Sequence, residues 1–493
     1  MSKDLHSLIN NLNKSEKRYF TQYLGRVSAK SEETIYARLF DYMTRAESYD
    51  RDDLLSKCSF INPSQLNNVR ARLYNYILES LRAYHSEGSG RISLHQMMIN
   101  YEILVNKGLF SQAVKMLKKA EKKASLLEGT FLLEEILELQ EYIITRRLKS
   151  KKNKEEIITL QTKIQTRRAT QIRQNELKWN RMLGYNLFRK EGRLTRNISS
   201  IKQFEERILK FKERFTLDEN SYMEVYHSHL ESSLLYRIQG KFQSSFNELE
   251  KLESFYNENL SYVESHPEDY LRYMINRVIA LNMLKQFDTS LKTINKIRIM
   301  GNSAQTEEQR LMIFENTTFH EIEIYLYRRQ FNKAVELVEK NLLTIQNSME
   351  KIHTVNQQSK LYRIALAYFG IGEYKTSLRW VNQILNYDQM KYRKDILSSV
   401  QILNLLIHTE LKNYTLVESL LRSSEIYLKK IGRWMTPEKL VISALKKYIL
   451  YRKNKSKIFS QLSIDLANNQ KENPLDEHFI AYFDLQKWIG NKG

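Results

Sequence analysis

The chain has 493 residues, of which only 14 are glycine and 4 are proline, whereas average usage is roughly 7% and 5%. So few turn-forming residues exclude architectures built from many hairpins and tight loops, such as sandwiches, barrels and glycine-rich nucleotide folds. Lys and Arg number 78 against 57 Asp and Glu, a formal net charge of +21. Long helices and a basic surface are therefore predicted, and the fold class is all-α.

Residues 1–87 predict an N-terminal helical domain. We expect helices at Asp4–Leu12, Ser15–Gly25 with Ser15 as its cap, Ser31–Arg45, Arg51–Lys57 and Pro63–His85. Short helices before a long one can form a helix-turn-helix DNA reader. The region holds 13 Lys and Arg against 11 Asp and Glu, whereas a DNA reader concentrates positive charge. A helical cap or docking module is therefore favoured, with DNA reading as the alternative.

The four prolines are predicted to mark helix starts. Proline at a first helical position loses no intrahelical hydrogen bond, and Asn or Thr before it can cap the free N–H groups. The dipeptides are Asn62-Pro63, His266-Pro267, Thr436-Pro437 and Asn473-Pro474.

Six segments share one local pattern. An aromatic residue is followed three positions later by a small residue, or by valine in the last copy, and seven positions later by an aliphatic residue. These offsets trace one face of a helix. We expect the aromatic residues to pack one helix pair against the next; they are Phe110, Phe242, Phe287, Phe331, Tyr374 and Tyr414.

The spacing of these aromatic residues predicts further copies. It is about 44 residues from Phe242 onward, and the gap from Phe110 to Phe242 is three such periods. Two degenerate copies are therefore expected near Lys154 and Leu194. About eight helix pairs would fill the repeat domain, residues 91–428, and a basic helical cap would follow at 429–493.

The best copy resembles the tetratricopeptide repeat family. The residues that carry the resemblance are Leu361, Ile364, Ala365, Tyr368, Gly372, Tyr374, Ser377 and Val381. It covers about two thirds of the chain and implies a right-handed α-solenoid of helical hairpins. The period exceeds the family's usual 34 residues, so HEAT or armadillo units of about 40–47 residues are the alternative. The opening NLNKSEKRYF is similar to that of bacterial helical-repeat proteins and carries no function.

Two segments hold the whole positive excess. Residues 146–214 contain 21 Lys and Arg against 7 Asp and Glu, and residues 429–457 contain 10 against one acid, Glu438. Such blocks attract polyanions through counterion release. The candidate anion-binding residues are Arg146, Arg147, Lys149, Lys151, Lys152, Lys154, Arg167, Arg168, Arg173, Lys178, Arg181, Arg189, Lys190, Arg193, Lys429, Lys430, Arg433, Lys446, Lys447, Arg452, Lys453 and Lys455.

Aromatic residues accompany both blocks and have two interpretations. Beside arginine they could stack on unpaired bases, or they could be helix-packing core. They are Trp179, Tyr185 and Phe188 in the first block, and Trp434, Tyr448 and Tyr451 in the second.

The sequence predicts no catalytic, cofactor or metal site, and no small-molecule substrate. The phosphate-loop, dinucleotide, nucleophile-elbow and zincin motifs are missing from it. His227 and His229 are two apart, so on a helix they face different sides. Cys58 is the single cysteine, which leaves no intrachain disulfide, and a buried structural role is favoured for it. No stretch resembles a signal peptide or a membrane span, so we expect a cytoplasmic protein.

Three functions remain open. The favoured one is a non-enzymatic scaffold whose basic blocks dock an anionic partner: RNA, the ribosome or an acidic protein. The second is a DNA-binding transcriptional regulator in which the repeats sense a peptide or protein. The third is a protein–protein adaptor in which the basic blocks are incidental.

Overall fold

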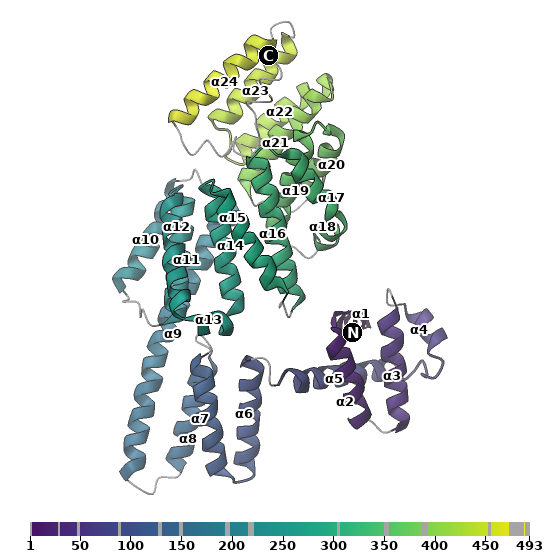
Figure 1. Cartoon of the computed structure of the whole chain (residues 1–493), viewed down its shortest axis with the longest axis vertical. Coiled ribbons are helices and arrows are strands. Elements are labelled where there is room, and N and C mark those ends of the chain that lie inside the picture. Colours follow the sequence, from purple (N-terminus) through teal and green to yellow (C-terminus); the bar gives the residue numbers. More distant parts are fainter. Residues whose placement is uncertain are drawn as a thin grey trace. The chain divides into compact units, whose positions relative to one another are not determined.

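The computed structural model describes residues 2–27, 30–46, 50–86, 90–126, 131–146, 151–192, 198–214, 221–302, 306–349, 354–386, 393–451, 455–472 and 488. Every regular element in these ranges is a helix and none is a strand, so the all-α prediction is confirmed (Figure 1). None of the described helices is both long enough and apolar enough to cross a membrane. Contacts divide the chain into two compact units, Met1–Gln171 and Ile172–Gly493.

The first unit begins with five helices around one hydrophobic core. Leu5, Ile9, Phe20, Leu39 and Leu73 are among its buried residues. The expected helices are all present, with ends shifted by up to three residues. They are α1 (Ser2–Asn11), α2 (Lys14–Val27), α3 (Lys30–Arg45), α4 (Arg51–Lys57) and α5 (Leu66–His85).

Some predicted helix starts are wrong by a few residues. Asn13, and not Ser15, caps α2: the Glu16 amide donates to Asn13 Oδ1 at 2.9 Å and the Asn13 amide donates to Glu16 Oε2 at 2.8 Å. This is a reciprocal capping box, which needs partners three residues apart. Pro63 lies in a turn before α5.

The prediction that a proline begins a helix is confirmed for one of the later prolines and wrong by one residue for another. Pro267 begins α14 as predicted, but the cap of α23 is Met435, so Thr436 is the first helical residue and not the cap. Pro474 lies outside the described residues.

The remaining helices of the first unit are α6 (Gly90–Asn106), α7 (Phe110–Leu126), α8 (Leu132–Arg146) and the start of α9 (Lys151–Glu191). With 41 residues, α9 takes the place of two repeat helices. Lys154, near which one degenerate copy was expected, lies in the first turn of α9. The helix ends at Glu191, just before Leu194, near which the other copy was expected. The division between the two units falls within it.

The second unit continues with consecutive helices that pack in sequence. They are α10 (Ile198–Arg214), α11 (Tyr222–Ile238), α12 (Phe242–Glu258), α13 (Leu260–Ser265), α14 (Pro267–Met283), α15 (Phe287–Gly301), α16 (Glu307–Tyr327), α17 (Phe331–Lys340), α18 (Leu342–Met349), α19 (Thr354–Gly370), α20 (Tyr374–Leu385), α21 (Lys394–Glu410), α22 (Tyr414–Lys430), α23 (Thr436–Leu450) and α24 (Lys455–Glu472).

Each of the six predicted aromatic residues is the first residue of a helix. Two positions earlier the backbone is left-handed, with φ between 57° and 86°, at Gly108, Gly240, Lys285, Arg329, Gly372 and Lys412. The next amide then donates to a carbonyl five residues back, as from Glu373 to Tyr368 at 3.0 Å. This is the Schellman arrangement, which satisfies the free carbonyls of the preceding helix.

The small residue three positions after the aromatic lies where the two helices of a pair cross. The Ser377 hydroxyl donates to the Ala365 carbonyl at 2.7 Å, and the Ser245 hydroxyl donates to the Ser233 carbonyl at 2.8 Å. All six small residues are buried: Ala113, Ser245, Ser290, Ala334, Ser377 and Val417.

The aromatic residues themselves are only partly buried, except that Phe110 is exposed. Phe331 packs against the next pair, because a Cβ on Gly370 would lie 2.2 Å from its ring. Beyond that, the first helix of one pair contacts the first helix of the next: α14 contacts α16, α16 contacts α19, α19 contacts α21, and α21 contacts α23.

The left-handed turn residues give a test of this geometry. Lys412→Gly is expected to raise the free energy of unfolding by about 0.5–1 kcal/mol, because relief of the left-handed strain outweighs the added chain entropy. Gly372→Ala should lower it by about 1 kcal/mol at the equivalent position. Urea unfolding followed by circular dichroism measures both. Equal signs for the two variants would contradict the shared turn geometry.

Candidate anion-binding site

The second unit contains a cavity of about 770 Å³ lined by five helices. Its walls come from α9, α11, α14, α16 and α19, of which the last four are the first helices of consecutive pairs. The lining from α9 is Lys178, Arg181, Met182, Tyr185, Asn186 and Arg189. The first basic block of the sequence therefore contributes one wall of this cavity.

Five cations from three helices line this cavity. They are Lys178, Arg181 and Arg189 on α9, Arg237 on α11 and Arg272 on α14. Within the described part of the chain, Arg181, Arg189 and Arg272 have no carboxylate partner in salt-bridge range. Like charges gathered without counter-charges destabilise the free site and favour an anion in it.

Tyr226 lies in the same wall and is fully buried. Its hydroxyl has no hydrogen-bond partner among the described residues, and Arg181 lies 5.8 Å from its ring centroid. Burial raises the pKa of Tyr226 well above its ordinary value, so the hydroxyl keeps its proton. A buried donor without a partner costs free energy.

The opposite wall differs in charge. Glu308, Glu315, Asn316 and Asn356 line it from α16 and α19. Glu315 forms an ion pair with Lys360 at 2.7 Å. Burial lowers the pKa of Lys360 to about 8, against the opposing effect of Glu315. Glu308 keeps an exposed carboxylate on this side.

The aromatic residues of the first block have separate environments. The ring of Phe188 lies near two guanidinium groups, 5.6 Å from that of Arg237 and 5.5 Å from that of Arg393, so intramolecular contacts already involve this ring. Trp179 and Tyr185 are exposed, and of the two only Tyr185 lines the cavity.

Two other arginines of the block hold helices together. Arg173 Nε donates to Glu224 Oε1 at 3.0 Å, and this carboxylate is fully buried. Arg168 donates to Glu134 and Glu138 of α8, each at 2.6 Å. Both therefore join neighbouring helices within their own unit, which makes them less available to a partner.

The remaining candidate anion-binding residues of the first block either lie away from the cavity or fall outside the described residues. Lys154 is exposed and Arg167 is half-buried on α9. The helical residues whose side chains lie outside the described part are Arg146, Lys151, Lys152 and Lys190. The candidates that lie wholly outside it are Arg147, Lys149 and Arg193.

The second block is partly neutralised by one acid that lies just before it. Glu425 accepts from Lys429 at 2.8 Å and from Lys446 at 2.7 Å. These hydrogen bonds lower the pKa of Glu425 to about 2. Lys429 also lies 5.5 Å from the ring of Trp434.

The other residues of the second block do not converge on a described cavity. Lys430 and Lys447 are exposed and Arg433 is buried. Tyr448 packs into the core and Tyr451 is exposed. Arg452 and Lys453 lie outside the described residues, as does the side chain of Lys455.

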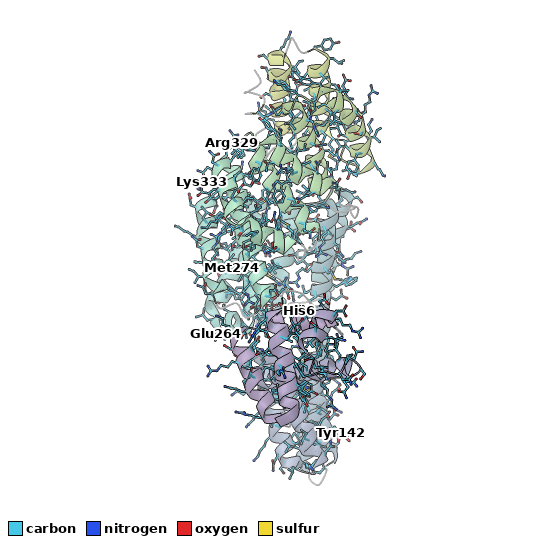
Figure 2. The ribbon with its side chains drawn as sticks, turned by 90° about the vertical axis from the view of Figure 1, so that its right-hand side faces the viewer. His6, Tyr142, Glu264, Met274, Arg329 and Lys333 are labelled. Atoms are coloured by element: carbon cyan, nitrogen blue, oxygen red, sulfur yellow. The ribbon has the colours of Figure 1, made fainter. Side chains whose placement is uncertain are left out.

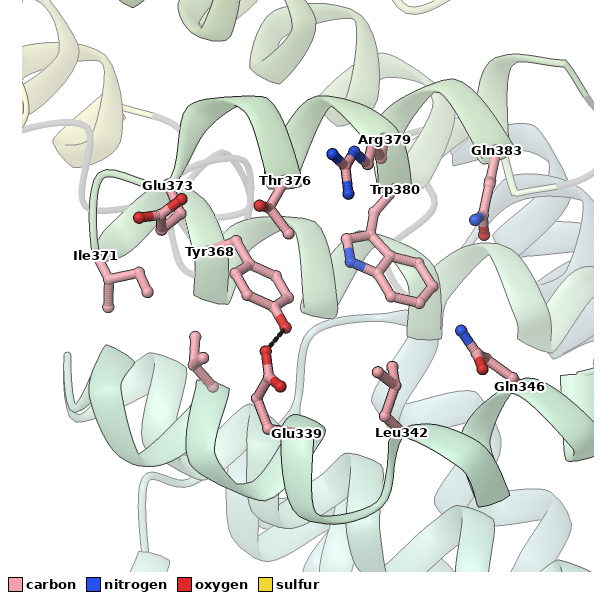
Figure 3. A pocket seen from close by; sticks show the side chains of 11 residues that line it. Glu339, Leu342, Gln346, Tyr368, Ile371, Glu373, Thr376, Arg379, Trp380 and Gln383 are labelled. Atoms are coloured by element: carbon pink, nitrogen blue, oxygen red, sulfur yellow. Dashed lines mark hydrogen bonds between the residues drawn. The ribbon is translucent and has the colours of Figure 1, made fainter.

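A second cavity, of about 540 Å³, lies between α17–α18 and α19–α20 (Figure 3). Glu339, Glu373 and Arg379 are its charged lining residues, and Trp380 forms part of its wall. Tyr368 already donates to Glu339 at 2.5 Å. Its charges are mixed and partly paired, so it attracts no single class of ligand.

The histidines and the cysteine singled out in the sequence have the following environments. No three metal-ligating side chains of the described residues cluster. His229 bonds to Glu248 at 2.8 Å, whereas His227 is buried on another side of α11. Burial raises the pKa of the Cys58 thiol, which disfavours a nucleophilic thiolate.

Comparison with known proteins adds no family. A scan of protein-family models finds no match to the chain, and a search of curated proteins finds none either. The cavity's chemistry therefore carries the functional argument.

Sequence reasoning missed part of this cavity. Arg237 and Arg272 lie outside both basic blocks, on helices whose net charge is unremarkable. Both lie on the first helices of consecutive pairs. The repeat pattern could have placed them on the same side of the array, and this was the signal that the sequence offered.

The role of Arg173 can be separated from ligand binding. Arg173→Ala is expected to lower the free energy of unfolding by about 3 kcal/mol, because the buried Glu224 loses its ion-pair partner. Arg168→Ala removes the same charge at an exposed pair and should change stability little. Thermal unfolding of both variants gives the comparison, and equal small effects would show that the Arg173 pair is not structural.

Proposed function

We propose that the protein is a helical-repeat binding protein that docks an anionic partner in the basic cavity of its second unit. The observation that carries the proposal is the convergence of five cations from α9, α11 and α14 on one cavity. Three of them lack a carboxylate partner in the described part of the chain. A partner's anionic groups would supply the missing counter-charges.

The repeat architecture supports a binding role. Pairs with the same turn and the same buried positions follow one another from α11 to α22, and from α14 onward their first helices contact in series. We infer a right-handed α-solenoid of the tetratricopeptide-like type, with long units. Such arrays present extended surfaces for partners, and a cytoplasmic location fits this role.

The two alternatives have less support. For a DNA-binding regulator, the described helices α1–α5 would have to read DNA, and their net charge is small. An adaptor in which charge is incidental leaves the convergence of cations from three helices on one cavity without explanation. Neither alternative accounts for the cavity.

Charge reversal tests the proposal directly. We expect the full-length protein to bind labelled anionic probes, either a peptide that alternates glutamate and leucine or an oligouridine strand of equal net charge. Arg181→Glu combined with Arg272→Glu should weaken binding more than about a hundredfold, because the anion then meets like charge. Affinity should also fall steeply as salt is added. Fluorescence anisotropy measures each affinity.

A matched control separates local from overall charge. Lys333 is exposed on α17 and does not line the cavity; it is labelled in Figure 2. Lys333→Glu changes the net charge as much as one of the cavity substitutions and should leave affinity within about twofold. If it weakened binding as much as Arg181→Glu alone, only overall charge would matter and the cavity would be excluded as the site.

A further inference from the structure

We propose that two copies of the chain associate through α6, with the two α6 helices packed antiparallel along their exposed sides. This inference is independent of the cavity in the second unit, because α6 belongs to the first unit. It depends on three features of α6: apolar residues on two of its sides, its place in the first helix pair, and opposite charges near its two ends.

The helix α6 is apolar on two sides. Its inner side contributes Leu94 and Tyr101 to the core that it shares with α7 and α8. Another side carries Ile99 and Ile103, which are 52% and 51% exposed, and Ile92, which is 40% exposed. A helix that is apolar all round is normally buried. The outer side of α6 is therefore of the kind that a partner covers.

The neighbouring helix α7 has the usual composition of a side that faces solvent. Its exposed residues include Lys115, Lys119 and Lys122. Among the 17 residues of α6, by contrast, Arg91 and Glu102 are those with a formal charge. The apolar outer side is therefore a property of α6 and not of the first unit as a whole.

The position of α6 explains why this side is exposed. With α7 it forms the first pair that has the left-handed turn, at Gly108. Among the described helices it packs chiefly on α7 and makes a smaller contact with α5 (Figure 1), and the described core of α1–α5 contains no residue of α6. A stacked array normally ends in a repeat with a polar outer side. The apolar side of α6 departs from this rule, and a second copy would cover it.

The exposed isoleucines form one stripe along α6. An α-helix turns by about 100° per residue, so Ile92, Ile99 and Ile103 project within about 40° of one another and span about 17 Å. If a second α6 lies antiparallel on this stripe, Ile103 of each copy lies beside Ile92 of the other. The two Ile99 side chains then lie near the two-fold axis. Burial of these side chains supplies the driving force for association.

The charges of α6 favour a reversed second copy over other partners. Arg91 and Glu102 are exposed and project on the same flank of the stripe, within about 20° of each other. They are 11 positions apart, as Ile92 and Ile103 are. The reversal that pairs these isoleucines therefore also places Arg91 beside Glu102 of the second copy, twice in a symmetric dimer. A parallel copy would bring like charges together, and an anionic membrane would attract Arg91 but repel Glu102.

Sedimentation velocity of the full-length protein tests the inference. An interface of one helix from each copy is small and therefore weak, so we expect a reversible change from monomer to dimer between about 1 and 100 µM. A protein that stays monomeric throughout this range would overturn the inference.

A substitution in the stripe shows whether α6 forms the interface. Ile99→Glu should weaken the dimer at least about tenfold, because apolar contact is lost and two carboxylates meet near the two-fold axis. Ile158→Glu is the matched control, because Ile158 is 55% exposed on α9 in the same unit; it should leave the affinity within about twofold. If Ile99→Glu had no effect, or no more than Ile158→Glu, the inference would be wrong.

An exchange of charges tests the antiparallel arrangement. Arg91→Glu should weaken the dimer about fivefold, because a carboxylate then meets Glu102 of the other copy at two symmetric places. Glu102→Arg alone should have a similar effect. Arg91→Glu combined with Glu102→Arg should restore the affinity to within about twofold of the unaltered protein, because the two positions are coupled across the interface. A double variant that dimerises no more tightly than the single ones would overturn the arrangement.

Discussion

A left-handed residue at the turn of six helix pairs is the constraint on which the repeat architecture depends. It lets the following amide reach back to the preceding helix and makes the next aromatic residue the first of the new helix. The second helix of each of these pairs starts two residues after the left-handed residue. The small residue three positions after that start therefore lies where the two helices of the pair cross. Close crossing at Ser245 and Ser377 then leaves the first helices free to contact one another, and those helices line the cavity.

The local pattern was enough to predict where the second helices begin. An aromatic, a small and an aliphatic residue on one helix face mark the face that packs against the first helix of the pair. It did not predict that α9 is continuous. Between Lys151 and Glu191 the sequence contains no proline and only Gly184, so nothing in it marks a break, and periodicity alone describes one long helix and two shorter ones equally well. The cap of α2 was missed for a related reason: Asn13 and Ser15 are both good caps, and only the reciprocal bond to Glu16 decides between them.

The sequence located the positively charged segments, but it did not predict which of their side chains form ion pairs within the protein. Arg173 counts as part of a basic block, yet its partner Glu224 is 51 residues away and is brought to it by the packing of α9 and α11. Glu425 stands four residues before the second block and accepts from two of its lysines. Arg237 and Arg272 belong to neither block but line the cavity. A count along the chain treats paired and unpaired cations alike, whereas the fold separates them.

The cavity brings together cations from three helices of the second unit. Elsewhere in the unit some charges on neighbouring helices are paired, as in Arg363 with Glu323 at 3.0 Å. At the cavity, three arginines without carboxylate partners and one buried hydroxyl without an acceptor lie within the same described wall. The Tyr226 hydroxyl costs free energy because it is buried without a partner, whereas Arg189 and Arg272 are exposed to solvent. Departures of this kind are typical of functional sites. An anionic ligand, as proposed, would add counter-charges beside Arg181, Arg189 and Arg272, so its binding would stabilise the folded protein.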